Sequence, residues 1–124
     1  MDLLLKEEVY AIVGNCIEVW KTLGYGFSEV VYKDAIEVEF LEDKLIYTRE
    51  SELPVYYKGK LLRHKFKADF TLFDNIIIEV KSGDDGINDA VISQTLNYLK
   101  VSGYRLGLII NFGKQKMEYK RLIV

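Results

Sequence analysis

The sequence has 124 residues and a net charge of −2, with 49% hydrophobic and 29% charged residues. This length and composition favour one folded domain over residues 1–124, with enough apolar side chains for one core. They exclude a largely disordered chain, and no apolar run approaches the ~20 residues that a membrane-spanning helix needs.

The rare residue types limit the chemistry. With one cysteine, Cys16, and one histidine, His64, a single chain cannot assemble a Cys/His zinc site or an internal disulfide. Cys16 lies on an apolar helical stripe, which favours a core residue over a nucleophile paired with His64. The start of the chain lacks the pattern of a leader peptide, and we expect a cytoplasmic location. Carboxylates and lysines remain, which favours oxygen-bound hard cations or acid–base chemistry.

Two helices are predicted in the first third of the chain. Residues 4–23 repeat apolar side chains at helical spacing, and Gly24 ends this pattern. Ser28 is a suitable N-cap for a second helix over about 29–42. The expected inner stripe of the first helix is Val9, Ile12, Val13, Cys16, Ile17 and Trp20. That of the second is Val31, Ala35 and Val38.

The rest of the chain predicts strands with one helix between them. The strands are expected at 45–58 (interrupted by Pro54), 61–73, 76–82, 105–111 and 117–124, the last at a sheet edge, and the helix at 88–102 before Gly103. The predicted order is α-α-β-β-β-α-β-β. It indicates an α/β fold with a mixed central sheet flanked by helices.

Alternation along two of these strands brings charged residues together. On 61–73 the polar positions are odd-numbered and include Asp69, while the even positions are mostly apolar. On 76–82, Glu79 and Lys81 share one side and the opposite side is wholly apolar. If the two strands pair, Asp69, Glu79 and Lys81 therefore converge on one patch.

This patch has the groups needed for phosphodiester hydrolysis. Two adjacent carboxylates repel each other, and a divalent cation such as Mg²⁺, for which Mn²⁺ can substitute, relieves that repulsion. Lys81 can orient the attacking water or stabilise charge on the phosphoryl group. The alternative is a solvated sheet face with an ion pair. The run Ile76-Ile77-Ile78 leading directly into Glu79 favours a site at the end of a core strand.

Two helical residues are candidates for the same site. Glu29 begins the second helix, and Gln94 shares a helix face with Tyr98. Taken alone, Glu29 is explained as a carboxylate favoured by the helix dipole, and Gln94 as an exposed helix former.

Five segments of the chain resemble blocks of the GxxExxY family. They are Gly26–Tyr32, which carries the Gly-x-x-Glu-x-x-Tyr motif, Leu53–Gly59, Lys67–Phe70, Asn97–Lys100 and Leu108–Gly113. The resemblance implies the PD-(D/E)XK nuclease-like superfamily and its restriction-endonuclease-like core (α-β-β-β-α-β), here with an extra N-terminal helix and a C-terminal edge strand. It implies that Asp69, Glu79, Lys81 and Gln94 are catalytic positions and that Glu29, Asp69 and Glu79 bind the metal. Ala68 stands where the superfamily often has proline.

The hairpin between the two strands provides a geometric test. A two-residue turn at Asp74-Asn75 would pair Asp69 with Val80, and Asp69 and Glu79 would then point to opposite faces. The site therefore requires a three-residue connection or a bulge.

Near Asp69, three basic residues, Arg63, Lys65 and Lys67, share its parity. They could hold phosphates, or they could simply deter pairing at a sheet edge. His64 has the opposite parity and is expected to be a hydrogen-bonded core or rim residue rather than a ligand.

Three functions are open at this point. The leading one is a Mg²⁺-dependent nuclease acting on DNA or RNA. The first alternative is a catalytically inactive nuclease-fold module that binds nucleic acid or regulates. The second is a structural oligomer subunit whose carboxylates are neutralised by lysines of another subunit. The expected partners are nucleic acid and a second copy in a homodimer, with no membrane.

Overall fold

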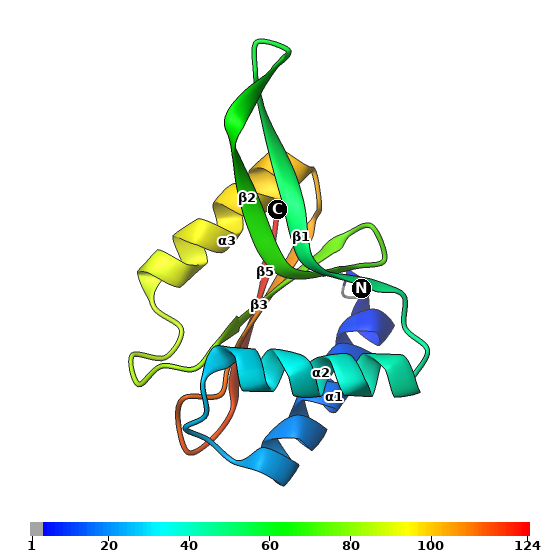
Figure 1. Cartoon of the computed structure of the whole chain (residues 1–124), viewed down its shortest axis with the longest axis vertical. Coiled ribbons are helices and arrows are strands. Elements are labelled where there is room, and N and C mark those ends of the chain that lie inside the picture. Colours follow the sequence, from blue (N-terminus) through cyan, green and yellow to red (C-terminus); the bar gives the residue numbers. More distant parts are fainter. Residues whose placement is uncertain (1–3) are drawn as a thin grey trace.

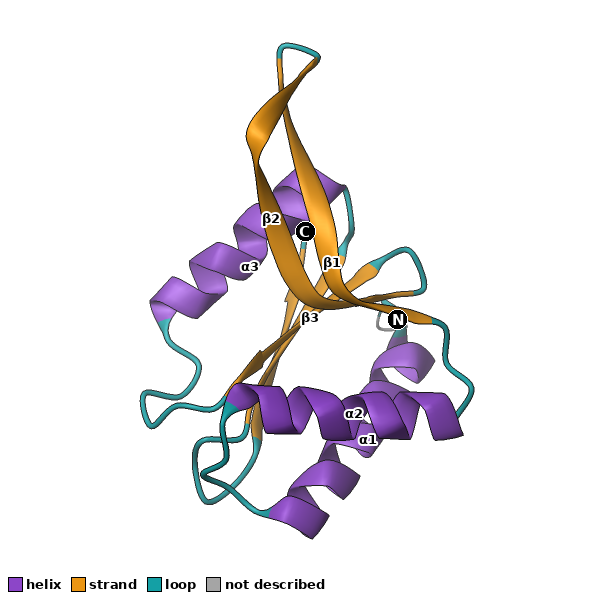
Figure 2. Ribbon diagram, viewed as in Figure 1, coloured by secondary structure: helices purple, strands orange, loops and turns teal. Residues whose placement is uncertain are grey.

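The computed structural model describes residues 4–124. Met1 to Leu3, the first residues of the segment that lacks a leader-peptide pattern, lie outside the described part. The described elements follow the predicted order (Figures 1 and 2). They are α1 (Lys6–Leu23), α2 (Glu29–Glu42), β1 (Tyr47–Tyr57), β2 (Lys60–Leu72), β3 (Ile76–Lys81), α3 (Asp89–Ser102), β4 (Leu106–Asn111) and β5 (Glu118–Ile123). The predicted α/β class is confirmed. No helix of residues 4–124 is both long and apolar enough to cross a lipid bilayer.

The strands form one mixed sheet in the order β1-β2-β3-β4-β5. β3 and β4 are parallel, whereas the other neighbours are antiparallel. The helices α1 and α2 pack on one face of this sheet, and α3 packs on the other. Pro54 lies on the edge strand β1, where its missing N–H is tolerated, and β5 forms the opposite edge as predicted.

The core confirms most of the predicted apolar positions and corrects α2. Cys16 is fully buried, and burial raises the pKa of its thiol. In α2 the buried stripe is Tyr32, Ile36 and Phe40 rather than Val31, Ala35 and Val38, and Val38 is 53% exposed. α2 has apolar residues on several sides, so aromatic packing decides its orientation. Tyr32 stacks on Phe112 with ring centroids 4.3 Å apart.

The β2–β3 hairpin has the three-residue connection that the site requires. Leu72 pairs with Ile76, and Phe73 and Asp74 both take positive φ values, 57° and 52°. Continuing this register places Asp69 opposite Glu79, and directly opposed residues share a face. The prediction of an irregular hairpin is therefore confirmed.

The β1–β2 ribbon changes its buried face at Asp69. Phe70 and Leu72 pack with α1 and α2, whereas Phe66 and Ala68, which have the same parity, pack with α3. The change coincides with Glu50, which lies between Arg49 and Ser51 in β1 and has φ 52°. Simple alternation predicts that Asp69 and Lys65 share one face of β2. The change of buried face at Asp69 shows that they do not.

Beyond this point the ribbon extends away from the rest of the sheet. β2 pairs with β3 only from Phe70 onward, so residues 51–68 of β1 and β2 form a two-stranded projection, here called the arm (Figure 1). The arm is twisted by a register shift between Pro54 and Tyr56.

Candidate active site

The candidate site lies at the fork where β2 and β3 separate. The last backbone pair between these strands is Phe70 with Ile78. One residue further on, two reciprocal side-chain bonds replace the backbone ladder. The backbone N–H of Asp69 donates to Glu79 Oε2 at 2.8 Å, and the backbone N–H of Val80 donates to Asp69 Oδ2 at 2.7 Å. The two carboxylates are thereby held in fixed positions close to each other.

Glu79 is the more deeply buried of the two acids. Its exposed fraction is 3%. Burial and then the charge of Asp69 raise the Glu79 pKa from 4.5 to about 8, against the opposing effects of the Asp69 N–H, Lys81 and Lys33. A second negative charge at Glu79 would therefore lie beside Asp69 where water screens it poorly, so the metal-free protein holds a proton on Glu79 up to about pH 8.

Lys33 of α2 supplies the nearest positive charge. Its Nζ lies 3.2 Å from Asp69 Oδ1 and 2.8 Å from Glu50 Oε1, and its side chain is 14% exposed. Burial lowers the Lys33 pKa, but its bond to Glu50 and the charge of Asp69 outweigh this and raise the pKa overall. A lysine of the same chain thus neutralises Asp69, the role that the oligomer alternative gives to another subunit.

Lys81 and Gln94 come together from β3 and α3. Lys81 Nζ donates to Gln94 Oε1 over a long 3.5 Å. Gln94 is exposed on the first half of α3, and Tyr98 lies one turn further along the same helix face. The pKa of the Tyr98 phenol is raised by burial and by the charges of Glu79 and Asp69, which places Tyr98 within the electrostatic reach of the carboxylates.

Glu29 meets the site at its outer end. Glu29 Oε2 accepts a 3.4 Å bond from the backbone N–H of Ser82, and the Ser82 hydroxyl donates to the carbonyl of Phe27. Both contacts dock the start of α2 onto the residue that follows Lys81. Within residues 4–124, however, no three His, Cys, Asp or Glu side chains are close enough to form a metal-binding group. The structure thus joins Asp69 to Glu79 and leaves Glu29 at the rim.

The donor atoms of Asp69 and Glu79 fit a hard divalent cation. Both side chains offer carboxylate oxygens only, and Mg²⁺ is commonly held by one or two carboxylates with water completing its shell. The crowded negative charge around buried Glu79 is the setting that such a cation stabilises. Two carboxylates are therefore sufficient for the predicted class of metal.

The basic residues of the arm lie farther out. Arg63, Lys65 and Lys67 are exposed, and Lys65 forms an ion pair with Glu52 at 3.1 Å. Lys65 and Lys67 border a cleft that also contains Gln94. Because Phe66 and Ala68 pack with α3, alternation turns the Lys65 and Lys67 side chains toward the other face of β2. His64 is exposed rather than buried in the core, and its ring lies edge-on to Phe66.

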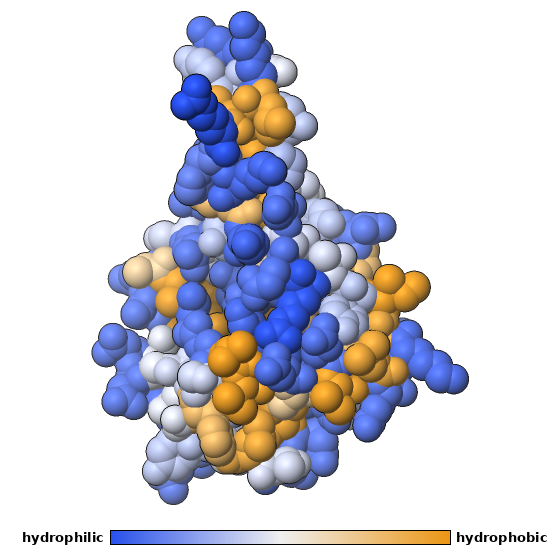
Figure 3. All heavy atoms as spheres, viewed as in Figure 1, coloured by the Kyte–Doolittle hydropathy of each residue, from blue (hydrophilic) through white to orange (hydrophobic). Residues whose placement is uncertain are grey.

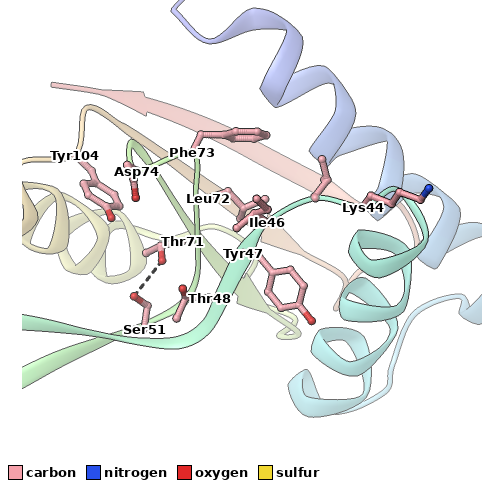
Figure 4. A pocket seen from close by; sticks show the side chains of 11 residues that line it. Lys44, Ile46, Tyr47, Thr48, Ser51, Thr71, Leu72, Phe73, Asp74 and Tyr104 are labelled. Atoms are coloured by element: carbon pink, nitrogen blue, oxygen red, sulfur yellow. Dashed lines mark hydrogen bonds between the residues drawn. The ribbon is translucent and has the colours of Figure 1, made fainter.

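A cavity at the other end of β2 is separate from the carboxylates. It measures about 470 Å³ and is lined by residues around the start of β1 and the end of β2, among them Thr48, Asp74 and Tyr104 (Figure 4). Thr71 Oγ1 donates to Ser51 Oγ at 3.0 Å inside it. None of the sequence-predicted site residues lines this cavity, so volume alone does not mark the site.

Sequence reasoning missed Lys33 and Glu50. Lys33 follows Glu29 by four residues, and this spacing on a helix places both on one face. That signal was available, but the contact with Asp69 depends on how α2 packs against β2. Glu50 contacts Lys33 from a position of positive φ, which alternation along a regular strand does not predict.

Comparison with known proteins agrees with this fold. A family model described as the PD-(D/E)XK nuclease superfamily matches residues 6–122. The chain belongs to this superfamily. No curated protein matches the chain. Among solved structures, the crystal structure of SSO0001 is similar, with a TM-score of 0.50 and 19% identity. That similarity covers 93% of this chain but 66% of SSO0001, slightly less than two thirds, and it supports the fold alone.

We expect Lys33→Met to destabilise the metal-free protein. The variant removes the cation that pairs with Asp69 and Glu50 and leaves the half-buried Asp69 carboxylate without its partner, which should cost about 1–3 kcal/mol, less than for a fully buried pair. Urea unfolding at pH 7.5 measures the change. Lys21→Met, which removes an exposed lysine of α1, is the control. Equal stability of the two variants would contradict the role of Lys33.

Proposed function

We propose that the chain is a metal-dependent nuclease that hydrolyses phosphodiester bonds of DNA or RNA. The observation that carries the proposal is the pair of reciprocal bonds that fixes Asp69 beside buried Glu79, with Lys81 on the same strand as Glu79. Superfamily membership makes a nuclease the expected activity, whereas the metal and the substrate are proposals.

Each residue has a distinct proposed role. Asp69 and Glu79 would hold Mg²⁺ or Mn²⁺, and Glu29 would approach from the rim. The bound cation would supply a Lewis acid for phosphoryl oxygens and lower the pKa of the attacking water. Lys81 would donate a hydrogen bond to that water or to the phosphoryl group. Gln94 would restrict the directions that the Lys81 ammonium can take, through the bond at its Oε1.

The basic residues of the arm have a proposed binding role. Arg63, Lys65 and Lys67 would contact phosphates and position the nucleic acid without selecting its sequence. The acidic remainder of the protein gives no general attraction to nucleic acid, so we expect binding to be local to this region.

The assay that tests the activity compares wild type with Lys81→Ala. We expect cleavage of some members of a panel of single- and double-stranded DNA and RNA when Mg²⁺ or Mn²⁺ is present, and none with a chelator. Lys81→Ala should cut about 10²–10³-fold more slowly, by analogy with removal of one donor that stabilises developing charge. Lys100→Ala, an exposed lysine of α3, is the control. Equal cleavage by both variants, or no cleavage with any metal, would overturn the proposal.

One observation favours the second candidate, an inactive binding or regulatory module. Lys33 already neutralises Asp69, and a third acid does not join the pair within residues 4–124. Calorimetric titration separates the candidates. The nuclease should take up Mn²⁺ and lose this uptake in Asp69→Asn. The inactive module should bind nucleic acid without any such uptake.

Three further assignments are proposed with the function. We propose membership of the GxxExxY family within the superfamily, on the sequence blocks that resemble it. A cytoplasmic location and a homodimer are proposed as well. Sedimentation of the purified chain tests the dimer.

A further inference from the structure

A cleft connects the arm to the candidate active site. It has a volume of about 390 Å³ and lies between β2 and α3. Gln94 belongs both to this cleft and to the contact with Lys81 at 3.5 Å. A ligand that lies in the cleft therefore passes a side chain that contacts the proposed catalytic lysine.

Three aromatic rings follow one another along this cleft. The centroids of His64 and Phe66 are 5.1 Å apart, and those of Phe66 and Tyr98 are 5.2 Å apart. His64 is exposed and Phe66 is half-buried, so the series runs from solvent into the interior. Beyond it, Tyr56 and Tyr57 are 63% and 61% exposed on the arm. Such rings are surfaces on which unpaired bases stack.

The same segment concentrates positive charge. Residues 56–67 contain five lysines or arginines and no acidic residue, in a chain whose net charge is −2. Of these five, Lys65 alone forms an ion pair among residues 4–124. Its partner Glu52 is 59% exposed, and a pair at the surface is weak enough for a phosphate to replace. Figure 3 shows hydrophilic side chains at the end of the arm and a hydrophobic patch beside them.

We propose that the arm and the cleft bind single-stranded nucleic acid and guide it toward Lys81. The inference rests on the proposed nuclease function and specifies its substrate class. Residues 56–67 combine basic and aromatic side chains, the two kinds of group that contact the charged backbone and the exposed base faces of a single strand. A duplex hides those faces by stacking, so the aromatic rings would favour the single strand.

The binding test uses no metal, so it is independent of cleavage. Fluorescence anisotropy measures a labelled 12-nucleotide oligothymidine against the same strand annealed to its complement, in chelator at low salt. We expect the single strand to bind at least tenfold more tightly. The double substitution His64→Ala with Lys67→Ala should weaken binding about tenfold, since it removes one stacking ring and one phosphate contact.

Three further variants separate a loss of binding from a loss of folding. Lys120→Ala removes an exposed lysine of β5 and should leave binding unchanged. Asn97→Glu places a negative charge on the α3 wall and should weaken binding independently of the arm. Lys67→Ala alone should reduce the slope of log affinity against log salt by about 0.7, which a general loss of structure would not do selectively. Circular dichroism confirms that each variant is folded.

The outcomes distinguish this inference from the proposed function. Preferential binding of the single strand that the cleft variants weaken supports the inference, even if no metal gives cleavage. Equal or tighter binding of the duplex overturns it. So does weakening by Lys120→Ala as large as that by the cleft variants. Cleavage of duplex at least as fast as single strand overturns the inference while leaving the nuclease function standing.

Discussion

Replacing Glu79 with glutamine is expected to stabilise the metal-free protein above pH 8 while abolishing its activity. The raised Glu79 pKa of about 8 means that the native state keeps this proton at pH values where the unfolded chain, with a pKa near 4.5, has lost it. The native state therefore binds more protons between these values, and the free energy of unfolding falls as pH rises from about 4.5 to about 8. The glutamine side chain of the variant carries no charge, so this loss should disappear.

The expected gain is on the order of 3 kcal/mol at pH 8.5 and close to zero at pH 4.5. Thermal or urea unfolding in chelator across this range measures it, with exposed Glu7→Gln as the control. Cleavage should fall by more than about 10²-fold, because several kcal/mol of charge stabilisation would be lost with the cation. A variant that is less stable than wild type at pH 8.5 would show that ionisation of Glu79 does not destabilise the native state.

Gly113→Ala is expected to damage both stability and the site. A Cβ at this position would lie 2.2 Å from the backbone N of Gly83 and 2.5 Å from its carbonyl oxygen. The Asn111 side chain holds that same residue through two bonds of 3.1 Å, to the N–H and the carbonyl of Gly83. Because backbone must move rather than a flexible side chain, we expect a loss of about 2–4 kcal/mol.

Gly83 follows Lys81 by two residues, so a displacement of the Gly83 backbone should also move the lysine. Misplacement by about 1 Å can cost about 10²-fold in rate. The matched control is Gly14→Ala. Its Cβ would have nothing within 4 Å and would stand inside α1, so the variant should be stabilised by about 0.5–1 kcal/mol. Opposite signs for the two variants are the expected result, and a wild-type melting temperature for Gly113→Ala would contradict the packing argument.

Local patterns in the sequence predicted the elements and the hairpin. Helical and alternating periods, with Gly24, Ser28 and Gly103 at helix ends, were sufficient for the element order. The requirement that Asp69 and Glu79 share a face predicted the three-residue connection, because alternation in a strand has a strict period of two. These features depend on residues that are close together in the chain, so they can be recognised from the sequence alone.

Packing decided what the patterns could not. The orientation of α2 follows from Tyr32 against Phe112, two residues far apart in sequence. The change of face at Asp69 follows from the backbone of Glu50 and from two helix layers that cover different parts of one ribbon. Alternation assumes a regular strand. It therefore places Arg63, Lys65 and Lys67 on the same face as Asp69, which the irregular β2 does not do.

The sequence by itself determined the fold class, the element order and the acids and lysine of the candidate site, because local periodicity and residue chemistry encode them. Only the tertiary structure decided that Lys33 neutralises Asp69, that Glu29 stays at the rim and that the segment around Phe66 forms a cleft with Gln94. These are contacts between elements. They depend on how whole helices pack on the sheet, and no short stretch of the chain specifies that.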